Sequence, residues 1–172
     1  MIKKSKIANY NSGTVGLLLA YLLCLSTSCQ NAQKEAPLFQ RLTSKQTGIT
    51  FKNEIIEDEV NNILNFTNLY TGSGVGIADF DKDGQPDIFF GGCMETSRLY
   101  LNKGNLKFED LTEKAGVTTD RWITGVTIGD INADSWIDIY LSVSGGTKGE
   151  KRKNLLYLNQ GLTHGVLTFI EA

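Results

Sequence analysis

The stretch "GVGIADFDKDGQPDIFFGG", residues 74–92, carries the pattern that decides the fold. A short apolar run leads into a loop with four aspartates, and a second run rich in β-branched and aromatic residues follows. Runs of this length and composition, bounded by Gly, Asp and Pro, are typical of β-strands. We therefore expect two strands here, joined by a tight acidic loop.

The same unit recurs 51 residues later as "GVTIGDINADSWIDIYLSV", residues 125–143. Two further segments return downstream: "RLYLNKG" from Arg98 as "LLYLNQG" from Leu155, and "LKFEDL" from Leu106 as "LTFIEA" from Leu167. The growing offset places insertions at "GGTKGEKRK" and "LTHGV", which we expect to form surface loops. Self-similarity of this extent indicates a repeat architecture.

Each repeat holds four short apolar runs separated by turn residues, without a helix-length pattern between them. Four antiparallel strands in about 40–50 residues match one β-propeller blade. An eight-stranded β-sandwich is the alternative, and it would need no repeat. We predict an all-β fold of about two four-stranded blades, part of a larger propeller. Repeat 1 covers about residues 74–113 and repeat 2 about residues 125–172.

The aspartates of the first loop have the spacing of a calcium-binding loop. Oxygen donors stand at positions 1, 3, 5, 7 and 9, namely Asp79, Asp81, Asp83, Gln85 through its backbone carbonyl, and Asp87. Gly84 at position 6 permits the sharp bend, and alternate side chains can turn inward around a hard cation. Position 12 is Phe90, where an EF-hand has a bidentate glutamate, and strands flank the loop, so this is not an EF-hand.

The second loop repeats the donor spacing with two changes. Its candidate calcium ligands are Asp130, Asn132, Asp134, Trp136 through its backbone carbonyl, and Asp138. Asn132 is neutral and Ser135 replaces the glycine, so we expect weaker binding. Two alternatives are a pair of Asp-rich turns without a metal, and magnesium, which prefers a stiffer octahedron with bound waters.

The first 29 residues have the pattern of an export signal. Three lysines precede a twelve-residue apolar run, Thr14–Leu25, which is shorter than the roughly 20 residues that span a bilayer. The small residues "STSC" end at Cys29, so the segment resembles a bacterial lipoprotein signal with Cys29 as the lipidated residue. An ordinary secretory signal is the alternative. The expected organisation is signal 1–29, flexible tether 30–46 and repeats 47–172, anchored by lipid in the bacterial cell envelope, at the outer membrane or cell surface.

Charge and cysteine content narrow the remaining function classes. A net charge of −2 gives no basic surface for nucleic acid. Cys24 and Cys29 belong to the signal, so Cys93 has no disulfide partner in the mature chain and is expected in the core.

His164 lies in a "THG" turn and is expected to face solvent. The run "ITFKNEI", residues 49–55, has a β-like composition and is expected to complete a blade.

The segment 74–92 followed by "RLYLNKGNLKFEDLTEKAGV" resembles the FG-GAP/VCBS repeat of integrin-α-like β-propellers. The likeness extends over about residues 47–172 and is closest to bacterial relatives of cartilage acidic protein, which often carry a further ASPIC/UnbV segment. The resemblance implies a calcium-stabilised, surface-exposed propeller used in adhesion or in glycan or protein binding. The chain departs from the family in having too few blades and no downstream segment.

The leading hypothesis is therefore a calcium-binding, non-enzymatic module with a glycan or protein ligand. The alternatives are the propeller part of a calcium-dependent polysaccharide-degrading enzyme, or an incomplete chain without independent function. Acidic residues outside the loops are expected on solvated faces, and no catalytic residue is assigned. Further blades, from a longer chain or an oligomer, are expected to cover the apolar side chains Val75, Ile77, Ile88, Phe89, Val126, Ile128, Ile137 and Ile139.

Overall fold

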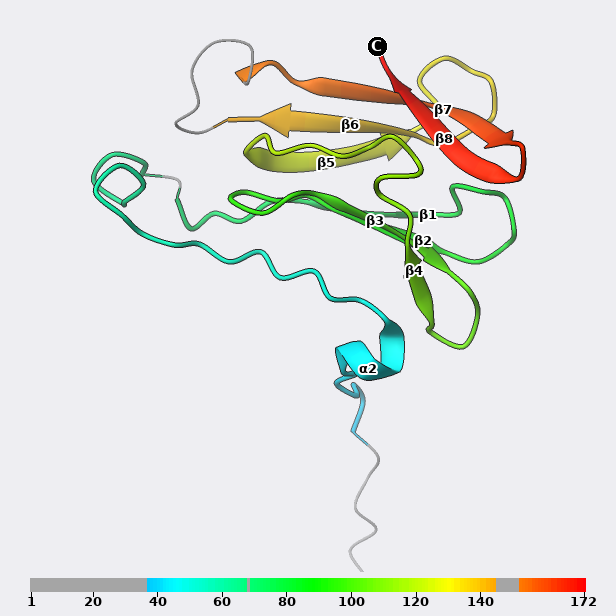
Figure 1. The fold of residues 1–172 in the computed structure, drawn as a ribbon, viewed down its shortest axis with the longest axis horizontal. Coiled ribbons are helices and arrows are strands. Elements are labelled where there is room, and N and C mark those ends of the chain that lie inside the picture. The colour runs from blue at the N-terminus through cyan, green and yellow to red at the C-terminus, as the bar shows by residue number, and fades with distance from the viewer. Residues whose placement is uncertain (1–36, 68, 145–151) are drawn as a thin grey trace, which may run out of the picture. The chain divides into compact units, whose positions relative to one another are not determined.

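The computed structural model describes residues 37–67, 69–144 and 152–172 (Figure 1). Residues Arg41–Ala172 form one compact unit. The predicted signal, Cys29 and the first part of the tether lie outside the described residues. Within the described ranges, no helix combines the length and apolar character needed to cross a membrane.

The unit contains two four-stranded antiparallel sheets, each with its strands in chain order. The first sheet consists of β1 (Val75–Ala78), β2 (Asp87–Phe90), β3 (Arg98–Asn102) and β4 (Phe108–Asp110). The second consists of β5 (Ile123–Gly129), β6 (Asp138–Val143), β7 (Leu155–Thr163) and β8 (Val166–Glu171). This arrangement confirms the all-β prediction and fits two propeller blades.

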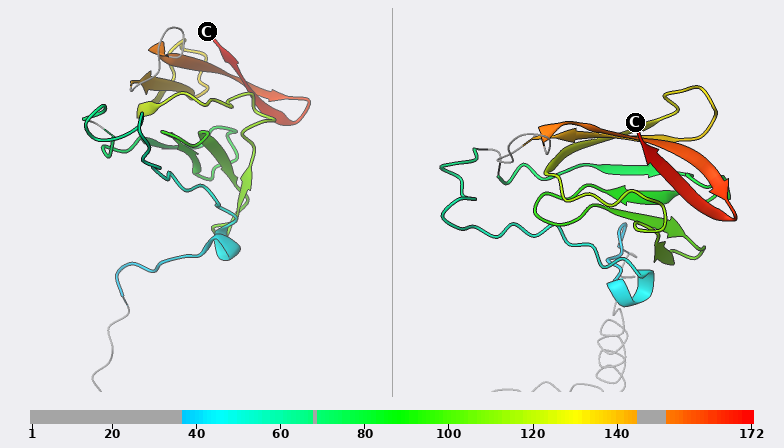
Figure 2. Two further views of the ribbon diagram at one scale, coloured as in Figure 1. Left: turned by 60° about the vertical axis from the view of Figure 1, so that its left-hand side comes forward. Right: turned by 45° about the horizontal axis from the view of Figure 1, so that its top comes forward.

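The sheets lie face to face and bury a common core between them (Figure 2). Phe89 and Leu99 are directly paired on the first sheet and face this core, as do Ile139 and Tyr157 on the second. The repeat aligns Ile139 with Ile88, whose side chain points to the opposite face from Phe89. Opposite faces of equivalent sheets therefore meet, which is the head-to-tail stacking of propeller blades.

This stacking covers part of the apolar faces within the chain itself. Phe89 and Ile139 are completely buried by sheet-to-sheet packing within the chain. Val75 and Ile77, by contrast, remain 53% and 59% exposed on β1. The apolar side chains are covered where the two repeats meet and uncovered at the outer side of the first one.

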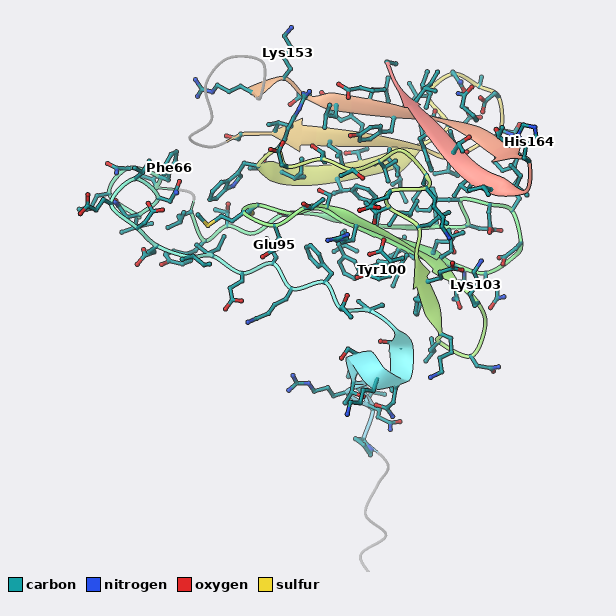
Figure 3. The ribbon with its side chains drawn as sticks, in the orientation of Figure 1. Phe66, Glu95, Tyr100, Lys103, Lys153 and His164 are labelled. Carbon is teal, nitrogen blue, oxygen red and sulfur yellow. The ribbon has the colours of Figure 1, made fainter. Side chains whose placement is uncertain are left out.

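Two local predictions were wrong. The insertion "LTHGV" is not a loop, because β7 continues to Thr163 and pairs with β8 from Val166. His164 and Gly165 have φ values of 52° and 78°, as a tight two-residue hairpin turn requires, so the insertion lengthens a hairpin. Figure 3 shows His164 at this turn, and its side chain is exposed, as predicted. Most of the other insertion, residues 145–151, lies outside the described residues.

The run 49–55 is not a strand. The backbone N–H groups of Thr50 and Phe51 donate to the Tyr100 hydroxyl oxygen, at 3.2 and 3.0 Å, instead of to a strand edge. The ring of Phe51 stacks on Phe90, with centroids 5.1 Å apart. This segment therefore covers part of the outer face of the first sheet, at Phe90 of β2 and Tyr100 of β3, and leaves Val75 and Ile77 of β1 exposed. Before it, the short helix α2 (Ser44–Thr47) spans the expected boundary between tether and repeats.

Candidate metal centre

The first acidic loop joins β1 to β2 and gathers three carboxylates. Asp79, Asp81 and Asp87 each place one oxygen atom within 4.8 Å of the others. Asp83, the remaining predicted side-chain ligand, does not belong to this group. A set of carboxylate oxygens at such close range fits a hard divalent cation such as calcium.

The loop is folded by hydrogen bonds from its own backbone to its aspartates. The two carboxylate oxygens of Asp79 accept the N–H groups of Asp83 and Gly84, at 3.0 and 2.8 Å. Lys82 and Gly84 adopt left-handed backbone conformations, with φ of 61° and 88°. Glycine adopts this conformation without steric cost, which explains its place at position 6. The loop thus holds its carboxylates together through geometry that local sequence specifies.

Asp87 anchors the loop to the sheet. It is completely buried, and its carboxylate accepts the N–H of Phe80 at 3.0 Å and the N–H of Asn102 at 2.8 Å. Burial raises the pKa of Asp87 to about 6; these two hydrogen bonds oppose the rise, and the charges of Asp81 and Asp83 add to it. A cation in the loop would stabilise the charged carboxylate and act against both burial and repulsion.

The pKa of Asp81 in the same loop is raised as well. Burial is the main cause that raises its pKa, and the neighbouring charges of Asp83 and Asp79 raise it further. The charge of Lys103, on the turn between β3 and β4, lowers the pKa of Asp81 (Figure 3). The crowded carboxylates therefore carry an electrostatic cost that the lysine only partly offsets.

The second loop, between β5 and β6, copies this backbone frame. Asp130 accepts the N–H groups of Asp134 and Ser135, at 3.0 and 2.8 Å, and buried Asp138 accepts those of Ile131 and Asn159, at 2.9 and 2.8 Å. Ser135 takes the left-handed conformation with φ of 71°, so the bend forms without glycine but with a side chain that disfavours it.

The two loops differ in their charges. Asn132 stands where the first loop has Asp81, and its amide nitrogen donates to Asp134 at 2.8 Å. Among the described residues, three carboxylates within 4.8 Å occur in the first loop. The second loop therefore offers one carboxylate fewer than the first, because an amide takes the place of Asp81.

The predicted carbonyl donors, Gln85 and Trp136, have matching backbone positions. The N–H of each donates at 2.8 Å to the aspartate two residues earlier, Asp83 and Asp134 respectively. The Trp136 ring also lies beneath Lys82 of the first loop, with Nζ 3.9 Å from the ring centroid. Gly161 leaves room for that ring, since a Cβ there would come within 2.6 Å of it.

Sequence reasoning missed two asparagines, Asn102 and Asn159. Each is buried, donates its backbone N–H to the last aspartate of its own loop, and accepts the N–H of the glycine two residues later. Each also donates its side-chain nitrogen to the carbonyl before that aspartate, Pro86 or Ile137. The signal was available in the repeated motif "LYLN-x-G", whose asparagine and glycine recur with an offset of 57.

The acidic residues outside the loops have surface roles. Glu109 lies 3.9 Å from Lys103 and 3.8 Å from Lys114, and Asp110 lies 3.5 Å from Arg98, all as partly exposed ion pairs.

Cys93 is buried and contacts the Ser73 hydroxyl at 3.0 Å, which confirms its prediction as a core residue.

Comparison with known protein families supports the resemblance in the central part of the chain. Residues 79–141 match the family model of the FG-GAP-like repeat. The matched region starts at the first aspartate of the first loop, includes the whole second loop and ends within β6. A search of curated proteins finds no match. The repeat match and the two stacked four-stranded sheets together indicate a β-propeller-like module.

Proposed function

We propose that this protein is a calcium-binding, non-enzymatic module of the bacterial cell envelope, with a glycan or protein ligand. The observation that carries the calcium proposal is the close approach of the Asp79, Asp81 and Asp87 carboxylates, within 4.8 Å, in a loop folded around them. Without a cation these groups repel one another: the charge of Asp79 raises the pKa of Asp81, and the charge of Asp81 raises the pKa of Asp87.

The candidate ligands of the first site are these three carboxylates together with Asp83 and the carbonyl of Gln85. The second site would use Asp130, Asn132, Asp134, Asp138 and the carbonyl of Trp136. A bound cation would supply compensating charge, and it would stabilise the fold because the unfolded chain lacks the assembled loops. Calcium suits these flexible, all-oxygen loops better than magnesium does.

Isothermal titration of the full chain with calcium tests the proposal. We expect a strong first site that Asp81→Asn weakens at least tenfold, because the substitution removes one of three clustered charges. Glu113→Gln is the matched control, since it removes an exposed acidic charge outside both loops. Binding that is absent, or that is unchanged by Asp81→Asn, would contradict the proposal.

The proposed module also needs neighbouring repeats, from a longer chain or an oligomer. The first repeat is covered on one side by the second, but Val75 and Ile77 on the other side are more than half exposed. In the second repeat, Val126 and Ile128 occupy the equivalent positions and pack against Gly76 of β1. An analogous strand of another repeat would therefore fit over Val75 and Ile77.

A further inference from the structure

Asn159 joins the backbones of the two acidic loops with a single side-chain amide. Its Nδ2 atom donates to the Phe80 carbonyl at 3.0 Å and to the Ile137 carbonyl at 3.1 Å. Phe80 lies between Asp79 and Asp81 of the first loop, and Ile137 precedes Asp138 of the second. The amide is therefore a hydrogen-bonded bridge between two candidate metal sites that lie on different sheets.

Two backbone hydrogen bonds extend this bridge to the carboxylates. The Phe80 N–H donates to Asp87 at 3.0 Å, and the Asn159 N–H donates to Asp138 at 2.8 Å. The connection thus runs from Asp87 through Phe80 and Asn159 to Asp138. All four residues have no solvent exposure, so water cannot replace a broken bond, and a shift at one end leaves a buried polar group unsatisfied.

Asn102 of the first repeat makes the corresponding bond within its own loop. Its side-chain nitrogen donates to Pro86 of its own loop, at 3.0 Å, which corresponds to the Asn159 bond to Ile137. The bond across the sheets belongs to Asn159. Two other contacts cross the same boundary: Lys82 lies 3.9 Å from the Trp136 ring centroid, and Phe80 meets Phe169 edge-on with centroids 6.1 Å apart.

We propose that the two loops bind their cations cooperatively and that Asn159 is the positioning residue that couples them. This inference rests on the proposed calcium function. A cation in the first loop fixes Asp87, which holds the Phe80 peptide, and the Phe80 carbonyl then fixes Asn159 and the Asp138 carboxylate. Because coupling between sites is reciprocal, each occupied loop raises the affinity of the other by the same factor.

Calorimetric calcium titrations of the full chain test the coupling, in the wild type, Asp81→Asn, Asn159→Leu and the double variant. Weakening the first loop by Asp81→Asn, so that the second loop fills while the first is still empty, should lower the second site's affinity by up to about 5- to 150-fold, the usual range of such coupling. In the Asn159→Leu background, Asp81→Asn should leave the second site's affinity unchanged. Asn102→Leu is the matched control: it removes the same bond within the first loop but should preserve the coupling.

The outcomes separate the coupling from the calcium proposal. If the wild type binds two calcium ions and Asp81→Asn leaves the affinity of the second loop unchanged, the coupling is overturned and the calcium proposal stands. The absence of any calcium binding by the wild type would overturn the proposed function, and the coupling with it. If Asn159→Leu does not fold, the comparison of the wild type with Asp81→Asn still decides whether the two loops are coupled. Coupling that survives Asn159→Leu in a folded protein would contradict the role of Asn159.

Discussion

Phe80 and Ile131 occupy the same position in the two repeats, but Phe80 is completely buried and Ile131 is 53% exposed. Both follow the first aspartate of their loop. Phe80 inserts against Phe169 of the second sheet, with ring planes at 73°. Ile131 points away from the shared core, so the described residues provide no equivalent partner sheet for it.

The two positions should respond differently to truncation. Phe80→Ala removes a buried aromatic ring from the boundary between the sheets and should lower the free energy of unfolding by about 3–5 kcal/mol. Ile131→Ala should change it by less than about 0.5 kcal/mol, as is usual at exposed positions. Urea denaturation in saturating calcium measures both, and similar effects of the two substitutions would mean that the packing between sheets is not as described.

The exposed apolar side chains should make the isolated chain self-associate. Ile77 and Ile131 are both more than half exposed, at the outer sides of the first and second repeats. We expect the full chain to form oligomers or aggregates in light scattering, and Ile131→Asp to reduce the associated fraction. A cooperative, calcium-loaded monomer would show that the two repeats need no neighbours.

Calcium should raise the melting temperature of the protein, and chelation should lower it. The loops bind the cation when folded and not when unfolded, so binding free energy adds to stability. Asp81→Ala should reduce the calcium-induced rise more than Asn132→Ala, because only the first removes a charged candidate ligand. Differential scanning calorimetry with calcium or chelator measures this; identical curves in both conditions would exclude a stabilising site.

The stability of the calcium-free protein should fall as pH rises from about 4 to about 6. Burial raises the pKa of Asp87 to about 6, above its ordinary value of 3.8, so the folded state binds this proton more tightly than the unfolded state does. Deprotonation therefore costs stability across this window. Denaturation in calcium-free buffers at several pH values tests the direction. Asp87→Asn should flatten the trend, and a wild-type stability that increases over the same window would contradict the assignment.

Cys29 should carry lipid, because it ends a segment with the pattern of a lipoprotein signal. Metabolic labelling with a fatty-acid analogue should mark the wild type and should not mark Cys29→Ser. Cys93→Ser is the control, since Cys93 is a buried core residue and its removal should leave labelling unchanged. An unlabelled, soluble wild-type protein would contradict the anchor.

Local sequence was sufficient for the strands and loops. β-branched and aromatic runs bounded by turn residues predicted all eight strands of the two repeats, since strand formation follows from short-range composition and alternation. The aspartate spacing likewise predicted the close approach of Asp79, Asp81 and Asp87, because the side chains and the backbone that orients them belong to one short loop. The hairpin at His164 was missed because an insertion was read as a loop although its flanks continue the strand pattern.

Only the tertiary structure decided how the repeats meet. Their faces read alike in sequence, so nothing local indicates that Phe89 is covered by the second sheet while Val75 and Ile77 stay exposed. The bridge from Asn159 to Phe80 joins residues 79 positions apart, and its partner is a backbone carbonyl, which has no signature in sequence. Burial and contacts across an interface depend on which surfaces come together in space, whereas strands and acidic loops follow from neighbouring residues.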